Sequence, residues 1–171
     1  DDLAQREARL QSEVTRLETA RETLLGGDQY TALNEAKRRA AALGRLAGTE
    51  PVIGSGITIS ITGKLSASTL LDAIQELRDA GASAIQISDR NLSARVVVNT
   101  WFADSTKGVK VSGTELTTPI TISVIGDSSV LTPAMQIPGG LSDTVSTGGG
   151  TVDISSADDV SISAVVPLPT S

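Results

Sequence analysis

Leucine recurs at every seventh position near the beginning of the chain, at Leu3, Leu10, Leu17 and Leu24. A repeat of seven places these side chains on one face of an α-helix, as in a coiled-coil seam with leucine at the d position. The a positions are then Glu7, Val14 and Arg21, so that only one of the three is apolar. We name the four leucines the leucine stripe and interpret them as candidate partner-binding residues.

The charges beside the leucine stripe bear on what could pair with it. In a parallel homodimer, Glu13 of one helix would face Glu18 of the other, which is a like-charge contact. We therefore expect weak self-association, or a different chain as the partner. The alternative is a single amphipathic helix that lies on its own head domain. A helix of 25 residues would be roughly 37 Å long at about 1.5 Å per residue.

Gly26 and Gly27 follow the leucine stripe and are predicted to interrupt the helix. Asp28 can then cap a second helix over residues 29–47. Gly48 and Pro51 are expected to end that second helix. Residues 1–50 are thus predicted to form a helical, coiled-coil-like stalk.

Residues 51–171 show the alternation of a mixed α+β domain. Strands are predicted at 52–63, 84–88 and 93–102, with a helix at 69–80 and a hairpin at 107–116 that turns at Ser112-Gly113. The tripeptide TIS at 58–60 recurs at 121–123, before a broken helical stretch at 128–145 and strands at 151–156 and 160–165. Two β-α-β-β units of this kind predict an α+β head, a ferredoxin-like two-layer sandwich.

The composition excludes several classes of chemistry. The chain contains no cysteine and no histidine, which removes disulfides, thiol nucleophiles, Ser-His-Asp triads and the common zinc ligands. The net charge of −6 argues against a nucleic-acid partner. Asp153, Asp158 and Asp159 match no calcium-loop spacing and are interpreted as solvated turn carboxylates. We assign no catalytic, cofactor-binding or metal-binding residue, and we expect no cofactor.

Aromatic residues make up only 2% of the sequence, and two of them are adjacent, Trp101 and Phe102. Neighbouring residues of a strand point to opposite faces, so one can enter the core while the other faces outward. Because aromatic side chains often dominate binding interfaces, both are candidate partner-binding residues. The alternative is that the hairpin after them covers both side chains.

Three blocks of the sequence resemble a known bacterial family. They are LAGTEPVIGSGITISITG at 46–63, DAGASAIQISDRNLSARVVV at 79–98 and PITISVIGDSSVLTPAMQIPGG at 119–140. The blocks occur in the order seen in DUF881, a family of Gram-positive and notably actinobacterial proteins of unknown function. The resemblance implies one N-terminal transmembrane helix, a coiled-coil segment and an extracytoplasmic α+β head, encoded near cell-division genes. It implies no catalytic motif, and it places the expected membrane anchor upstream of Asp1.

The residues and the resemblance together lead to two hypotheses. The first is a non-enzymatic, single-pass protein of the cell membrane, with this region outside the cytoplasm and acting as a protein–protein interaction module. Its partners would be other envelope or division proteins, including a homologous family member through the coiled coil, in cell division or cell-wall assembly. The alternative is an extracytoplasmic ligand-binding module for a cell-wall glycan or peptide. A hydrolase would have to rely on Asp, Glu, Lys or Ser alone.

Overall fold

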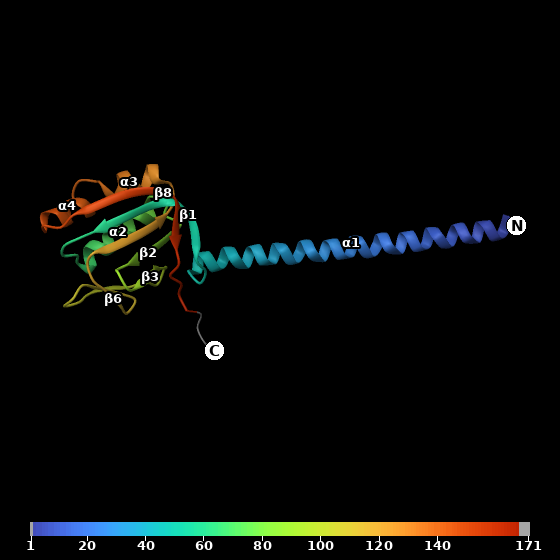
Figure 1. Ribbon diagram of the computed structural model, residues 1–171, viewed down its shortest axis with the longest axis horizontal. Coiled ribbons are helices and arrows are strands. Elements are labelled where there is room, and N and C mark those ends of the chain that lie inside the picture. Colours follow the sequence, from blue (N-terminus) through green and yellow to red (C-terminus); the bar gives the residue numbers. More distant parts are fainter. Residues whose placement is uncertain (1, 168–171) are drawn as a thin grey trace. The chain divides into compact units, whose positions relative to one another are not determined.

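The computed structural model comprises two compact units, Asp1–Ala42 and Leu43–Ser171. We name them the helical unit and the head unit. The structure describes residues 2–167, leaving aside the side chains of residues 2–4 and 25. Within these residues the chain forms a long N-terminal helix followed by antiparallel sheets with three shorter helices (Figure 1). The predicted α+β class is therefore confirmed.

Helix α1 is continuous over Asp2–Ala47. The predicted interruption at Gly26 and Gly27 is wrong, as is the second helix that was expected to begin after Asp28. Glycine can adopt helical dihedrals and costs only about 1 kcal/mol relative to alanine in a helix interior. The good helix formers on both sides outweigh that cost, so the glycines weaken the helix without ending it.

The end of α1 is fixed by Gly48, which has a φ of +73° that favours glycine. The Gly48 N–H donates to the Arg45 carbonyl at 3.3 Å, and the Thr49 N–H donates to the Gly44 carbonyl at 2.9 Å. These two bonds form a Schellman motif. The predicted end of the helical segment at residue 47 is thus confirmed.

The main sheet of the head unit has five strands in the order β3-β2-β7-β1-β8, with neighbours antiparallel. These strands are β1 (Val52–Ile61), β2 (Ala84–Ser88), β3 (Ser93–Val96), β7 (Ile120–Ile125) and β8 (Val152–Ile162). The helices are α2 (Ala67–Asp79), α3 (Ser128–Met135) and α4 (Leu141–Thr147). A second, three-stranded sheet joins β4 (Phe102–Asp104), β5 (Val109–Val111) and β6 (Thr114–Leu116).

The helices and the small sheet share one apolar core with a single face of the main sheet. Ile57, Ile59 and Ile61 of β1 are fully buried there, while the intervening residues point to the other face. Leu70 and Ile74 of α2 pack against them. Fully burying one such side chain stabilises the fold by about 1.5–3 kcal/mol, so this aliphatic core compensates for the scarcity of aromatic residues.

Two predicted strand boundaries differ from the structure. The expected strand 93–102 is two strands, because the Thr100 hydroxyl accepts a bond from the Val97 N–H and turns the chain into the second sheet. The expected strands 151–156 and 160–165 are one strand, β8, and Asp158 and Asp159 lie at its bulge. An Asp-Asp pair is typical of a turn, but a bulge accommodates one extra residue without ending the strand. The second predicted β-α-β-β unit therefore contributes one strand after its helices.

The second face of the main sheet is partly covered by the segment after β8. A small apolar cluster lies on this face, made of Val52, Ala84, Ile125, Val160 and Ile162. Beside it, the Ala164 N–H donates to the Gln86 side-chain oxygen at 2.7 Å, and the Val166 N–H donates to the Gly48 carbonyl at 2.7 Å. The segment after β8 therefore ties β2 to the end of α1.

Candidate interaction surfaces

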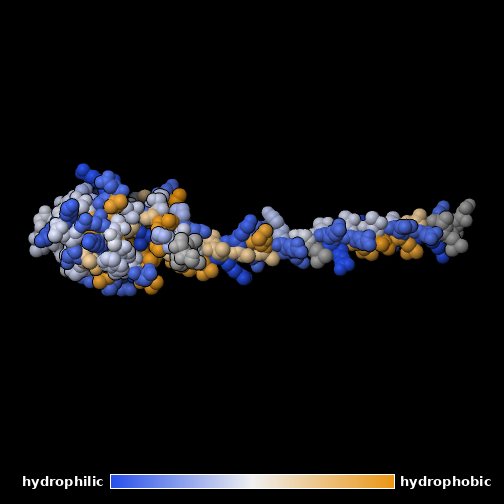
Figure 2. Space-filling model, turned by 90° about the horizontal axis from the view of Figure 1, so that it is seen from below, coloured by the Kyte–Doolittle hydropathy of each residue, from blue (hydrophilic) through white to orange (hydrophobic). Residues whose placement is uncertain are grey.

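The leucine stripe is exposed along the helical unit. Leu10, Leu17 and Leu24 and the neighbouring Val14 have between 53% and 70% of their surface in contact with solvent. Leu3 lies in α1, but its side chain is outside the described residues. Figure 2 shows hydrophobic side chains exposed along the helix. Large aliphatic side chains that recur on one helix face without cover are typical of a surface that a partner buries.

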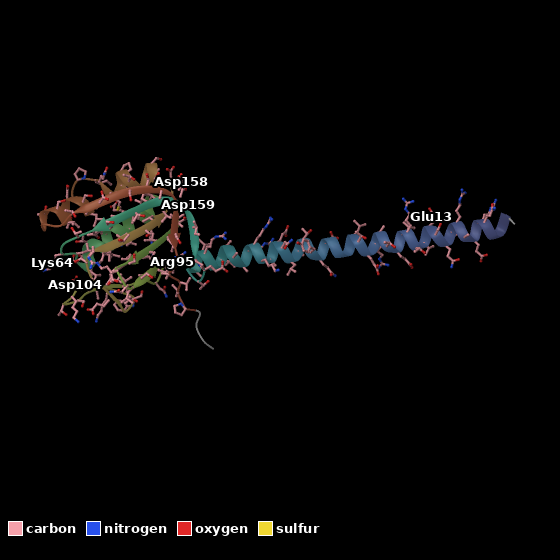
Figure 3. All side chains as sticks on the ribbon, in the orientation of Figure 1. Glu13, Lys64, Arg95, Asp104, Asp158 and Asp159 are labelled. Carbon is pink, nitrogen blue, oxygen red and sulfur yellow. The ribbon has the colours of Figure 1, made fainter. Side chains whose placement is uncertain are left out.

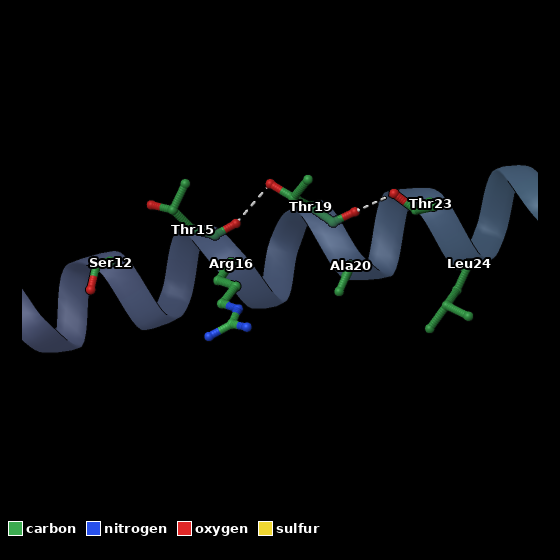
Figure 4. A pocket seen from close by; sticks show the side chains of 7 residues that line it. All are labelled: Ser12, Thr15, Arg16, Thr19, Ala20, Thr23 and Leu24. Atoms are coloured by element: carbon green, nitrogen blue, oxygen red, sulfur yellow. Dashed lines mark hydrogen bonds between the residues drawn. The ribbon is translucent and has the colours of Figure 1, made fainter.

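Thr15, Thr19 and Thr23 point away from Leu24, on the opposite side of the same helix segment (Figure 4). The Thr19 hydroxyl donates to the Thr15 carbonyl at 2.9 Å, and the Thr23 hydroxyl donates to the Thr19 carbonyl at 2.9 Å. These hydroxyls are satisfied within their own helix, and the surface they line lies on one helix only, so that no second wall encloses it. The leucine stripe is therefore the face whose side chains still lack favourable contacts.

Trp101 and Phe102 belong to the head unit, at the start of β4. Phe102 is half-buried and packs against the main core, whereas Trp101 is 51% exposed. The Trp101 carbonyl accepts a bond from the Ser112 N–H at 2.9 Å, which holds the backbone of Trp101 beside the turn of the β5–β6 hairpin. Of the two aromatic residues, Trp101 is thus the one that presents a surface to solvent.

A cleft of the head unit has a volume of about 700 Å³ and lies at the N-terminus of α2. It is lined by polar side chains that include Lys64, Lys107 and Asp104, and Figure 3 shows Lys64 and Asp104 at the same end of the head unit. Asp104 accepts a bond from the Ala67 N–H at 2.7 Å, and Ser66 caps the same helix. Two of the first-turn N–H groups of α2, those of Ala67 and Thr69, are therefore already engaged by the protein.

A smaller cleft of about 330 Å³ separates α2 from the α3–α4 connection. Asp72 and Glu76 of α2 line one side, and Met135, Ile137 and Leu141 line the other. Carboxylates from a single helix face do not face each other across the cleft, so this geometry is not that of a carboxylate pair for glycoside cleavage. Within residues 2–167, no three acidic side chains gather as they would around a metal ion.

The only buried arginine among the described residues joins the main sheet to the end of α1. Arg95 of β3 is 5% exposed, and its guanidinium donates to the Arg45 carbonyl at 3.0 Å and to the Glu50 carbonyl at 3.2 Å. Burial lowers the pKa of Arg95 below its usual value. A cation at the C-terminus of a helix is stabilised by the carbonyls that point toward it, so Arg95 completes the cap begun by Gly48.

A second electrostatic feature organises the turn between β2 and β3. The Asp89 carboxylate accepts bonds from the Thr117 N–H at 3.0 Å and from the N–H groups of Asn91 and Leu92, each at 2.8 Å. These bonds, led by the one from Thr117, lower the pKa of Asp89. Asp127 caps α3 in the same way, and the Ser129 hydroxyl and N–H lower the pKa of Asp127. Both carboxylates are therefore structural.

The sequence indicated some of these surfaces and missed others. The spacing of the leucines was sufficient to find the stripe, and the aromatic pair identified Trp101. The sequence analysis did not identify Arg95. A signal was present, because Arg95 lies between Ala94 and Val96 in a strand, and such alternation places the arginine on the second face of the sheet. Its partners lie 45 and 50 residues earlier, at a helix end that only the folded chain brings close.

Comparisons with known proteins identify relatives without a known activity. A family model described as a bacterial protein of unknown function, DUF881, matches residues 39–170. The UPF0749 proteins Rv1825 of Mycobacterium tuberculosis and Mb1856 of Mycobacterium bovis are each 39% identical over 170 residues. The match covers 96% of this chain but 58% of each relative, so the chain spans less than two thirds of their length.

A solved structure shares the fold. The crystal structure of an uncharacterized conserved protein from Mycobacterium tuberculosis is 38% identical, with a TM-score of 0.74 over 78% of this chain and 95% of that chain. Within residues 2–167, no helix combines the length and hydrophobicity needed to cross a bilayer.

Proposed function

This chain belongs to the bacterial DUF881 family, and on that premise we propose that it is a non-enzymatic, membrane-anchored envelope protein that acts as a protein–protein interaction module. Its anchor is a single transmembrane helix upstream of Asp1, and the region described here lies outside the cytoplasm. Its partners are envelope or division proteins, in cell division or cell-wall assembly.

The observation that carries this proposal is the exposed leucine stripe. Leu10, Leu17 and Leu24 are each more than 60% exposed, although leucine is among the residues most often buried. Burying the remaining surface of one of them in a helix–helix contact would contribute about 1–2 kcal/mol. A partner helix that covers the whole stripe therefore gains enough apolar contact to bind, without any special chemistry on either side.

The head unit supports a non-enzymatic role. The cleft at the N-terminus of α2 contains one carboxylate, Asp104, and that group is engaged in holding the first turn of α2. The chain has no histidine or cysteine to serve as a general base or nucleophile at neutral pH. For the fold, we also propose the ferredoxin-like interpretation for β1, β2, β7 and β8, whose order in the sheet is β8-β1-β7-β2.

Photocrosslinking from the helix in intact cells tests the interaction role. The full-length protein is produced in its native bacterium with a photoreactive residue in place of Leu17, or in place of Thr19 as the matched control on the other face. We expect crosslinks to a specific membrane or envelope protein from position 17 and few from position 19. Equal crosslinking from both positions, or recovery of the full-length protein outside the membrane fraction, would contradict the proposal.

The alternative function is a ligand-binding module for a cell-wall glycan or peptide. The polar cleft of about 700 Å³ is the observation that favours it, since its volume is in the range of small-molecule sites. Titration of the protein with soluble cell-wall fragments, followed by the fluorescence of Trp101 near the start of β4, tests this alternative. A saturable change abolished by substitution of Lys64 would support it, and a flat titration would count against it.

A further inference from the structure

The charged residues that flank the leucine stripe indicate which charge pattern a partner helix must carry. With leucine at d, Glu7 and Arg21 occupy a positions, Glu13 occupies a g position and Glu18 an e position. All four side chains are exposed. Among the residues that the structure describes, none of the four forms an ion pair within its own helix. These groups are therefore available to select a partner.

A parallel second copy of the chain fits these positions poorly. In a parallel two-stranded coiled coil, each a residue meets the same a residue of its partner, and each g residue faces the e residue of the next heptad. Self-pairing would thus place Glu7 against Glu7, Arg21 against Arg21 and Glu13 against Glu18 on both sides. Like charges at such positions oppose pairing and are a common device for excluding a wrong partner.

We propose that the leucine stripe binds a parallel helix from a different chain with the inverse charge pattern. That helix carries leucine at its d positions, a basic residue opposite Glu7, and basic residues at the positions that face Glu13 and Glu18. It carries an acidic residue opposite Arg21 and an aliphatic residue opposite Val14. The leucines supply most of the affinity, and the charges supply the choice of partner and its register.

The parallel orientation of the partner helix rests on the proposed function, in which the chain is anchored in a membrane. Two chains anchored upstream of their helices in the same membrane leave it side by side, so their helices run parallel. An antiparallel second copy would instead bring Glu7 near Arg21 of the other chain and would remove the like-charge contacts. Self-pairing of that kind is therefore the competing outcome of the test.

Two designed peptides test the charge rule on the 171-residue chain. The complement peptide is a 28-residue helix, about four heptads, with the inverse charges at its a, e and g positions. The control peptide has the same composition, but its charged residues are exchanged with glutamines on its outer face. Binding of each labelled peptide is measured by fluorescence anisotropy. We expect the complement to bind at least about tenfold more tightly than the control, with the difference reduced at high salt.

Variants of the chain test whether Glu13 and Glu18 produce the preference for the complement peptide. The double substitution Glu13→Lys with Glu18→Lys should remove most of the preference for the complement. Glu22→Lys with Glu35→Lys changes the net charge equally but lies away from the stripe, and it should preserve the preference. Sedimentation equilibrium should find the wild-type chain monomeric at concentrations that saturate the complement.

Each other outcome overturns the inference, and the outcomes are distinguishable. Equal affinity for the two peptides refutes the charge rule but leaves the leucine stripe as a contact surface, so the proposed function survives. Self-association of the wild-type chain that is tighter than its binding of the complement makes a second copy the occupant. Binding of neither peptide removes the stripe as a helix-binding surface, and the proposed function loses its main support.

Discussion

Replacing Arg95 with methionine tests how the end of α1 is held by the main sheet. Methionine retains an unbranched apolar side chain of similar length, so the packing of the stem changes little. The substitution removes the guanidinium and its two hydrogen bonds to the carbonyls of Arg45 and Glu50. The Arg45 carbonyl keeps its bond from the Gly48 N–H, whereas the Glu50 carbonyl loses a partner in a partly buried site.

The size of the effect follows from these contacts. Hydrogen bonds to a charged group contribute about 1.5–3 kcal/mol each, so the two bonds of Arg95 represent a gross loss of about 3–6 kcal/mol. Part of this is recovered because a buried guanidinium no longer has to be desolvated. We expect a net decrease of about 2 kcal/mol in the free energy of unfolding, or roughly 6–8 °C in Tm. Arg95→Lys keeps the charge but not the fork of donors, and should lose about half as much.

Urea unfolding followed by the fluorescence of Trp101 measures this change, because the sole tryptophan of the sequence lies in the head unit. Arg90→Met serves as the control, since Arg90 is exposed in the turn after β2 and should change stability by less than about 0.5 kcal/mol. Hydrogen exchange should accelerate at the amides of residues 43–50 in Arg95→Met only. Equal stability of the Arg95→Met and Arg90→Met variants would refute the reasoning, as would unchanged exchange at the end of α1.

Three further predictions concern other elements. Backbone hydrogen bonds lower the pKa of Asp89, so its contribution to stability is present above about pH 4 and is lost as the pH falls through the lowered pKa. The loss of unfolding free energy caused by Asp89→Asn, measured in urea, should therefore become smaller in acid. A loss that stays constant from pH 7 to pH 2 would contradict this. A Cβ on Gly56 would lie 1.8 Å from the Val124 carbonyl oxygen. Gly56→Ala should therefore destabilise the head unit by at least about 2 kcal/mol in urea unfolding. A much smaller loss of stability would contradict this prediction. An alanine side chain at Gly26 and at Gly27 would meet no other atom within 4 Å. Replacing both glycines with alanine should stabilise α1 by about 1–2 kcal/mol and slow amide exchange around residues 26–27. Unchanged exchange would show that the glycines do not limit the stability of the helix.

The sequence predicted those elements whose local pattern and final environment agree. The alternating isoleucines of β1 and the spaced leucines of α2 gave their elements directly, because each pattern faces the same core. The Ser112-Gly113 turn was equally clear, since both residues adopt the positive φ that a tight hairpin requires. In these cases no distant part of the chain had to be known.

The errors arose where distant contacts or neighbouring propensities decide the outcome. The bulge at Asp158 and Asp159 depends on pairing with β1, which lies about a hundred residues earlier, so a local pattern typical of a turn was misleading. The Gly26-Gly27 pair is typical of a helix end, but the glycine that ends α1 is Gly48, where the chain leaves the helix with a positive φ. For the interaction surfaces, the periodicity of the leucines was visible in the sequence, whereas the role of Arg95 required the folded head unit.

The helical unit and the head unit are stabilised by different means, and this bears on how a partner would act. Buried aliphatic side chains hold the head unit together, whereas the exposed part of α1 depends on helix propensity, which its two glycines lower. Helices without tertiary packing are only marginally stable in water. A partner that covers the leucine stripe would therefore add the packing that α1 lacks, and part of the binding free energy would be used to order the helix. Within the head unit, Arg95 and Gly48 hold the last turn of α1 against the main sheet, so the order of that turn does not depend on a partner.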